Sequence, residues 1–209
     1  MLPLDYLRDP GAIAARSFAL ANELSDLSAL PPGLRPLTLR LVHACGMPEI
    51  APDIAFAGDA VAAGRAALAA GATVLCDARM VEVGILWDRL PPACRTFCGV
   101  DDQRTRKLAE DLRTTRSAAA VELWRPHLDG AVVAIGNAPT ALFHLLERLA
   151  EWPERPAAIL AFPVGLVGAA ESKSALIEAG LEVPYVTLRG RFGGSALAAA
   201  AVNALLLDG

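Results

Sequence analysis

The sequence lacks the features that mark membrane, secreted and metal-binding proteins. Its uncharged C-terminal stretch, 192–207, is interrupted by Asn203 and is shorter than the roughly 20 apolar residues of a membrane helix. Charged residues come early at the N-terminus, where a secretory signal would carry an apolar segment. The four cysteines form no Cys-x-x-Cys pair, and the three histidines have no zinc-type spacing. We therefore expect a cytoplasmic protein with reduced cysteines, no metal site and no membrane segment.

Motifs for nucleotide binding and hydrolysis are also missing. The sequence contains no phosphate-binding P-loop, no Gly-x-Gly-x-x-Gly fingerprint and no nucleophile elbow. The net charge of −4 argues against a general nucleic-acid surface. An anionic ligand would therefore have to be met by locally placed arginines.

What the sequence does have is a high apolar content, arranged as alternating strands and helices. Hydrophobic residues make up 54% and the mean hydropathy is +0.40, enough for one domain over residues 1–209 to bury a core. Strands are predicted at 54–57, 73–76, 95–98, 131–135, 158–162 and 185–188. Helices are predicted at 13–27, 34–44, 59–70, 101–112, 116–125, 139–150, 169–179 and 195–207. This alternation predicts an α/β fold whose parallel sheet is covered by helices on both faces.

Unusual loops follow several of the predicted strands. In open parallel sheets, ligands bind beyond the carboxyl ends of the strands. Glycines there let a backbone approach a ligand closely, and helix N-termini favour anions. Tight turns would explain most of these loops. Two arginines, Arg189 and Arg191, within one glycine-rich turn instead indicate an anionic ligand.

His43 is the candidate for acid–base chemistry. The leucines of the helix predicted at 34–44 share one face, and His43 lies away from it, on the side of Arg40. His43 also lies in the last turn, where the negative helix end favours the imidazolium form, a proton donor. The alternative is a solvated histidine that only complements the helix dipole. His127 and His144 are predicted to be solvated.

Three further residues are candidates for ligand contacts. Ser17 falls in the apolar stripe of the helix predicted at 13–27, where its hydroxyl needs either the carbonyl one turn earlier or a ligand. Arg116 stands at a predicted helix start, an unfavourable place for a cation unless a ligand carboxylate lies nearby, although a solvated arginine there costs little. Asn137 begins a strand–turn–helix junction in which Pro139 suits the first helical turn.

Seven segments of the chain together resemble a known family, precorrin-8X methylmutase. They lie in order and at the family's spacing, from about residue 13 to the C-terminus. One such segment alone would be weak evidence, whereas seven in register are specific. The segments are RSF (16–18), LVHA (41–44), CDARMV (76–81), TRSAAA (115–120), AIGNAPTALF (134–143), PVGLVGAAESK (163–173) and RGRFGGSA (189–196).

The resemblance implies a three-layer α/β/α, flavodoxin-like fold with an N-terminal helical extension, and a homodimer. It also implies an isomerase of cobalamin biosynthesis that converts precorrin-8X to hydrogenobyrinate by a methyl shift from carbon eleven to carbon twelve of the tetrapyrrole ring. The family's catalytic histidine corresponds to His43, its substrate-contacting serine to Ser17 and an active-site arginine to Arg116. The substrate carries carboxylates, and the other expected contacts are Arg189, Arg191 and Asn137, with Arg79 behind them. Such an intramolecular shift needs no cofactor.

Three alternatives remain open at this point. The segment after the histidine, 44–47, resembles the aerobic branch of the family, whose substrate holds no cobalt; the same shift on cobalt-precorrin-8 is the rival within the family. A non-enzymatic corrinoid carrier would bind the tetrapyrrole without transforming it. A nucleotide-binding α/β enzyme is disfavoured by the missing phosphate motifs.

Overall fold

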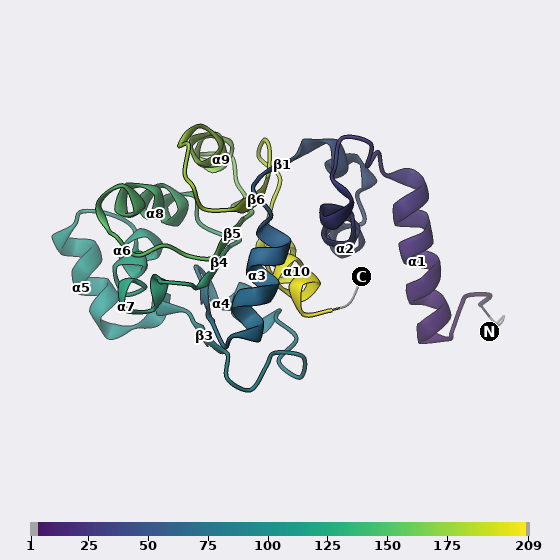
Figure 1. The fold of residues 1–209 in the computed structure, drawn as a ribbon, viewed down its shortest axis with the longest axis horizontal. Helices are drawn as coiled ribbons and strands as arrows, with labels where there is room; N and C mark the ends of the chain where they lie inside the picture. The colour runs from purple at the N-terminus through teal and green to yellow at the C-terminus, as the bar shows by residue number, and fades with distance from the viewer. Residues whose placement is uncertain (1–3, 208–209) are drawn as a thin grey trace.

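The computed structural model describes residues 4–207 and is built around one six-stranded sheet with helices on both faces (Figure 1). The order across the sheet is β1-β6-β5-β4-β2-β3. Each strand has the place that its apolar run predicted, to within a residue at either end. The strands are β1 (Ile54–Ala57), β2 (Thr73–Cys76), β3 (Arg95–Phe97), β4 (Val132–Ile135), β5 (Ala158–Ala161) and β6 (Tyr185–Leu188).

The expectation of a wholly parallel sheet is wrong at one edge. Strands β2 to β6 pair in parallel, but β1 pairs antiparallel with β6. Alternating strands and helices predict parallel pairing only between two strands that are joined by a helical crossover and are neighbours in the sheet. β1 instead pairs with the last strand of the chain. The five parallel strands have the order of flavodoxin-like sheets, so the topological switch point lies between β2 and β4.

The helices form one layer on each face of the sheet. On one face lie α2 (Arg35–Cys45), α3 (Ala60–Ala69), the short α4 (Arg79–Val83) and α10 (Ser195–Leu206). The other face carries α6 (Arg116–Glu122), α7 (Arg125–Leu128), α8 (Pro139–Glu151) and α9 (Ala169–Glu178), with α5 (Gln103–Asp111) packed on α6. The three-layer arrangement is thereby confirmed. Short 3-10 helices span Pro32–Leu34, Pro48–Asp53 and Gly99–Asp101.

The helix predicted at 116–125 is in fact two helices. α6 ends at Glu122, and α7 begins at Arg125 with Pro126 in its first turn. Proline has no amide hydrogen to continue a helix, but it suits the first turn of a new one. The five-residue α4 was not predicted, because so short a helix has no readable periodicity.

The central strands β2, β4, β5 and β6 contribute to two cores. In β4, Val132 and Ala134 belong to the core under α2, α3 and α10, while Val133 and Ile135 belong to the core under α6 to α9. Successive side chains of a strand point to opposite faces, so a strand covered on both sides is apolar throughout. The continuous apolar runs of the sequence therefore reflect this double burial.

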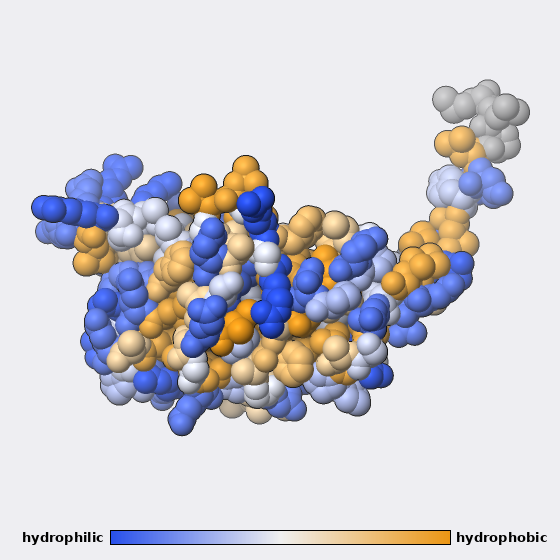
Figure 2. All heavy atoms as spheres, turned by 90° about the horizontal axis from the view of Figure 1, so that it is seen from above, coloured by the Kyte–Doolittle hydropathy of each residue, from blue (hydrophilic) through white to orange (hydrophobic). Residues whose placement is uncertain are grey.

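The N-terminal helix α1 (Pro10–Leu24) stands at one end of the molecule and packs against α2 (Figure 1). Within residues 4–207 its predicted apolar stripe is covered only in part: Leu20 is half-buried, but Ile13 is 45% exposed and Leu24 is 62% exposed. Figure 2 shows the N-terminal part of the chain, including α1, projecting from the rest of the molecule with apolar surface along it. No helix in residues 4–207 is long and apolar enough to cross a membrane.

Candidate functional site

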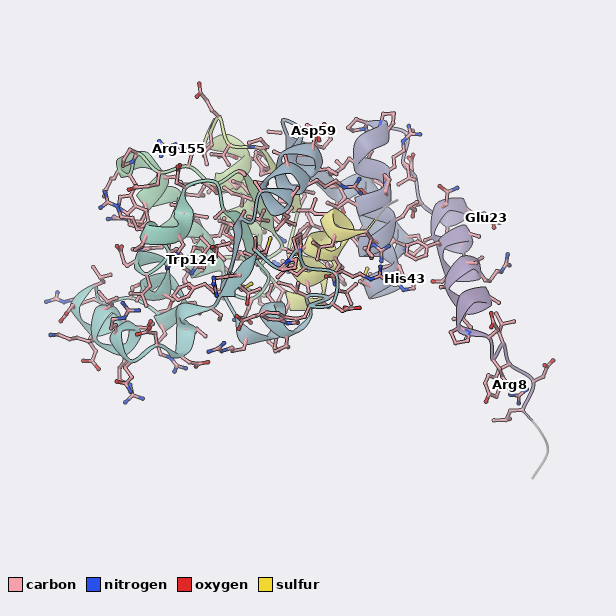
Figure 3. The ribbon with its side chains drawn as sticks, turned by 60° about the horizontal axis from the view of Figure 1, so that its bottom comes forward. Arg8, Glu23, His43, Asp59, Trp124 and Arg155 are labelled. Carbon is pink, nitrogen blue, oxygen red and sulfur yellow. The ribbon has the colours of Figure 1, made fainter. Side chains whose placement is uncertain are left out.

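His43 lies in the last turn of α2, as the sequence predicted (Figure 3). Leu37 and Leu41 of the same helix are buried against the sheet, whereas His43 is exposed. Gly46 ends the helix with a left-handed conformation at φ 69°, which glycine adopts without strain. The imidazole is therefore held at a helix end and outside the core.

Two residues of α1 fix the imidazole. The Ser17 hydroxyl lies 2.7 Å from His43 Nδ1, and the Phe18 ring stacks on the imidazole with centroids 4.7 Å apart and planes at 13°. The Arg40 guanidinium lies 5.1 Å from the centroid of the same phenyl ring. Ser17 thus uses its hydroxyl on His43 and not on its own helix. Within residues 4–207 nothing bonds His43 Nε2, so that nitrogen is free for a ligand.

His43 lines a cleft of about 350 Å³ between α2, α10 and the turn after α4. Asn203 of α10 holds that turn in place: its Oδ1 accepts a hydrogen bond from Leu86 N at 2.9 Å, and its Nδ2 donates to Gly84 O at 2.9 Å. The cleft is lined by Arg40, His43, Ala44, Gly84, Leu86, Ala196, Ala199, Ala200 and Asn203. A smaller cleft of about 150 Å³ on the α1 side of the imidazole includes Ser17.

The glycine-rich turn Arg189–Gly194 leads directly from β6 into α10, whose Ala196 lines the His43 cleft. Its backbone is pinned at both ends, since Arg189 N donates to Asp53 O at 2.9 Å and Gly194 N donates to Phe162 O at 2.7 Å. Arg189 and Arg191 are exposed, and neither guanidinium has a hydrogen-bond or ion-pair partner in the described part of the chain. The predicted pair of arginines is therefore free to bind anions.

Asp77 fills the topological switch point between β2 and β4. Its buried carboxylate accepts hydrogen bonds from the amides of Gly136, Asn137 and Ala138 at 2.9, 2.9 and 2.6 Å. Burial raises the pKa of the Asp77 carboxyl, and the amide hydrogen bonds offset only part of that rise. Backbone amides at a switch point would otherwise bind a ligand phosphate. Here they are already used, which argues against the nucleotide-binding alternative.

Asn137 lies beside the first turn of α10. A Cβ on the preceding Gly136 would come within 2.7 Å of Ser195 Cα, so the turn after β4 is in close contact with the start of that helix. The Asn137 side chain is exposed there. The carboxyl ends of β4 and β6 and the His43 cleft thus meet around α10.

Arg116 is the first residue of α6, as predicted, and Thr115 caps the helix. It lines a separate cleft of about 390 Å³ that also includes Asp101, Asp102 and Arg106. The two acids have other partners: Asp102 pairs with Arg104 at 2.7 Å, which lowers its pKa to about 2, and Asp101 lies 3.4 Å from Arg79. Arg116 itself has no side-chain partner within residues 4–207. A single chain does not bring Arg116 into the cleft of His43.

The comparisons with known proteins identify the family. The family model described as precorrin-8X methylmutase matches residues 12–207.

The chain belongs to the precorrin-8X methylmutase family.

Curated relatives named precorrin-8X methylmutase include one from Pseudomonas aeruginosa, 55% identical over 98% of this chain and 99% of the relative, and one from Sinorhizobium sp, 52% identical over 98% of each. A cobalt-precorrin-8 methylmutase from Methanothermobacter thermautotrophicus is 36% identical over 93% of this chain and 91% of the relative. Among solved structures, precorrin-8X methylmutase from Thermus thermophilus superposes with a TM-score of 0.84 at 36% identity, covering 94% of both chains. The resemblance stated from the sequence is confirmed.

Two expectations for this member of the precorrin-8X methylmutase family need correction. His144 is not solvated: its Nε2 lies 2.6 Å from a Glu122 carboxylate oxygen, because α8 packs on α6 and turns its polar side toward charged residues. Arg79 is a poor reserve anion binder, because its guanidinium already bonds Glu82 at 2.6 Å, which raises its pKa. His127 is exposed, as expected. No group of metal-binding side chains occurs within residues 4–207.

Sequence reasoning missed several residues that shape the site. Phe18 is next to Ser17 in the chain, but the apolar periodicity of the helix gave no sign that its ring stacks on His43. Asn203 was visible only as a lone amide in a helix of alanine and leucine, which is the signal that could have marked it. Asp77 directly follows the strand β2, and only the structure shows that its carboxylate accepts the amides of the turn after β4.

Proposed function

We propose that this protein is an isomerase that converts precorrin-8X to hydrogenobyrinate by moving a methyl group from carbon eleven to carbon twelve of the ring. Membership of the precorrin-8X methylmutase family over residues 12–207 supports the reaction. The relatives named for the cobalt-free substrate are 55% and 52% identical, against 34% and 36% for two named for cobalt-precorrin-8, which favours the cobalt-free substrate. The methyl group leaves one carbon and bonds to another carbon of the same molecule, so the reaction needs no co-reactant.

The observation that carries the mechanism is an exposed imidazole with one nitrogen held and the other free. Ser17 holds Nδ1 of His43, and Nε2 has no partner among the described residues. In the proposed mechanism Nε2 donates a proton or a hydrogen bond to the macrocycle near the migrating methyl. This withdraws electron density and eases the shift toward the more conjugated product. General acid catalysis contributes about 10²–10⁴ in rate, or roughly 3–5 kcal/mol of barrier.

Substrate binding is proposed to use arginines without internal partners. The corrin precursor carries carboxylates, which guanidinium groups grip in bidentate fashion. Arg189, Arg191 and Arg116 have no side-chain partners within residues 4–207, in contrast to Arg79, which is paired with Glu82. We propose Asn137, in the turn after β4 and beside the first turn of α10, as a further polar contact. Ser17 belongs to the same site through its bond to His43 and the smaller cleft that it lines.

We further propose a cytoplasmic homodimer. The exposed apolar side chains Ile13 and Leu24 on α1 would be covered by a second copy of the chain, which removes apolar area from water. A second copy could also extend a site to which one chain contributes two separate clefts. The four cysteines are free, which suits a reducing compartment. Light scattering at several protein concentrations would test the dimer, and a monomer throughout would contradict it.

The reaction is tested by an absorbance time course with precorrin-8X, comparing wild type, His43→Ala and the control His127→Ala. His127 is an exposed histidine on the far side of the sheet, so its replacement should leave turnover unchanged. Conversion to a hydrogenobyrinate spectrum by the wild type and the control, and not by His43→Ala, would support the proposal. A bound but unchanged spectrum would favour the carrier. Conversion of cobalt-precorrin-8 alone would favour the cobalt-dependent reaction.

A further inference from the structure

Lys173 is a charged side chain to which the proposed chemistry gives no role. It lies in α9, it is 0% exposed, and its ammonium donates a hydrogen bond to the main-chain carbonyl of Phe192. No carboxylate among residues 4–207 forms an ion pair with it. Burial lowers its pKa to about 8. The only other lysine of the chain, Lys107, is exposed on α5.

An unpaired buried ammonium works against folding, because the desolvation of its charge is not repaid by an opposite charge. A methionine is of similar length and would fill the same space without that cost. Packing of α9 therefore does not require the charge. The role of the ammonium is instead indicated by its hydrogen-bond acceptor, the Phe192 carbonyl.

That acceptor lies in the middle of the Arg189–Gly194 turn. The turn is otherwise held by backbone groups alone, including a bond from Gly165 N to Arg191 O at 3.4 Å. Gly193 lies so close to the end of β5 that an added Cβ would come within 2.3 Å of Phe162 O. Within the described residues, Lys173 supplies the single side-chain hydrogen bond to this turn. It fixes the carbonyl that immediately follows Arg191.

We infer that Lys173 is a positioning residue for substrate binding, which holds the Arg189–Gly194 turn so that Arg189 and Arg191 meet the carboxylates of the substrate. This inference rests on the proposed function, because the anion that the turn binds is the proposed substrate. Lys173 is fully buried, so in this proposal it acts on the turn and not on the ligand directly. His43 lies on α2, in the layer on the other face of the sheet, so its chemistry is not altered.

The test compares Lys173→Met with the matched control Lys107→Met, which removes the same charge from an exposed site. KM and kcat for precorrin-8X are measured together with amide hydrogen exchange at Gly193 and Gly194. We expect Lys173→Met to raise KM by about tenfold or more, as for the loss of a charge-assisted hydrogen bond, with kcat changed by less than about twofold. Exchange at the two glycines should become faster. The control should leave all three quantities unchanged.

A folded Lys173→Met with wild-type KM and wild-type exchange overturns the inference. If wild type does not turn over precorrin-8X, the proposed function fails, and the exchange measurement still decides whether Lys173 orders the turn. If Lys173→Met does not fold, the wild type with 13C-labelled lysine gives only two Cε signals in NMR. Addition of hydrogenobyrinate should then shift the Lys173 signal and leave that of Lys107 in place; an unmoved Lys173 signal contradicts the inference.

Discussion

The His43 cleft and the Arg189–Gly194 turn both border α10, and they are held in different ways. His43 is exposed at the end of α2 and has one side-chain hydrogen bond, to a helix that packs mainly on α2 itself. The turn is pinned to Asp53, to the end of β5 and to the loop that follows β5, and it receives a buried ammonium. The His43 imidazole is therefore held by one neighbouring helix, whereas the backbone of the Arg189–Gly194 turn is bonded to several separate parts of the fold.

The difference matches what each region is proposed to do. A proton donor must reach the substrate with a free nitrogen, which requires exposure and only a light hold on the other nitrogen. Groups that bind carboxylates gain from a fixed backbone, because less conformational entropy is lost when the ligand arrives. We therefore expect changes near His43 to alter rate with little effect on stability, and changes under the turn to alter binding and stability.

The largest expected effect is on His43. His43→Ala and His43→Asn should lower single-turnover rates by about 10²–10⁴, the usual contribution of a general acid. Because the side chain is exposed, the unfolding midpoint should stay close to that of wild type. Rapid-mixing absorbance at saturating precorrin-8X measures the rate. Near-normal rates in both variants would remove His43 from the mechanism.

The buried lysine gives a pH-dependent prediction. The Lys173 pKa is about 8 in the folded protein against an ordinary 10.5, so between these values the unfolded chain binds more protons and stability rises with pH. Below pH 8 the full penalty of the buried charge is present. Relative to Lys173→Met, wild type should gain about 3 kcal/mol of unfolding free energy across this window. Urea melts of both proteins from pH 7 to 11 measure the difference, and the comparison cancels the titration of the cysteines and Tyr185.

A smaller effect is expected from the loss of the hydrogen bond between Ser17 and His43. Ser17→Ala should lower turnover about fivefold, because a hydrogen bond of about 1 kcal/mol no longer fixes the imidazole. Ser17→Thr keeps the hydroxyl and should restore most of the rate. Steady-state turnover on precorrin-8X measures both. An equal loss in the two variants would mean that the hydroxyl is not what matters at this position.

The smallest expected effect is at Arg116, whose cleft is separate from that of His43 in one chain. Arg116→Ala should weaken hydrogenobyrinate binding by about 0.2–1 kcal/mol, as for an exposed ion pair, and should reduce the dependence of binding on salt. Titrations at low and high salt measure this. Arg95→Ala, an exposed arginine at the amino end of β3, is the control. Unchanged affinity at both salt concentrations would place Arg116 outside the binding site.

Local signals in the sequence determined most of the elements. Apolar runs predicted the central strands β2, β4, β5 and β6, because strands buried on both faces have no polar alternation. Proline and glycine predicted helix ends, as at Gly46, because their backbone preferences act within a few residues. The exposure of His43 followed from the same local pattern, and seven short segments were enough to indicate the family.

Only the tertiary structure decided which distant residues meet. The direction of β1 depends on its pairing with the last strand, and the Ser17–His43 contact joins residues 26 apart. The switch-point amides go to Asp77, about 60 residues earlier in the chain, while Arg116 lies in a cleft of its own. Lys173 in sequence is one more polar helix residue; the layers of the fold make it a buried charge. Side-chain periodicity reports which face of an element is covered, but long-range packing sets what covers it.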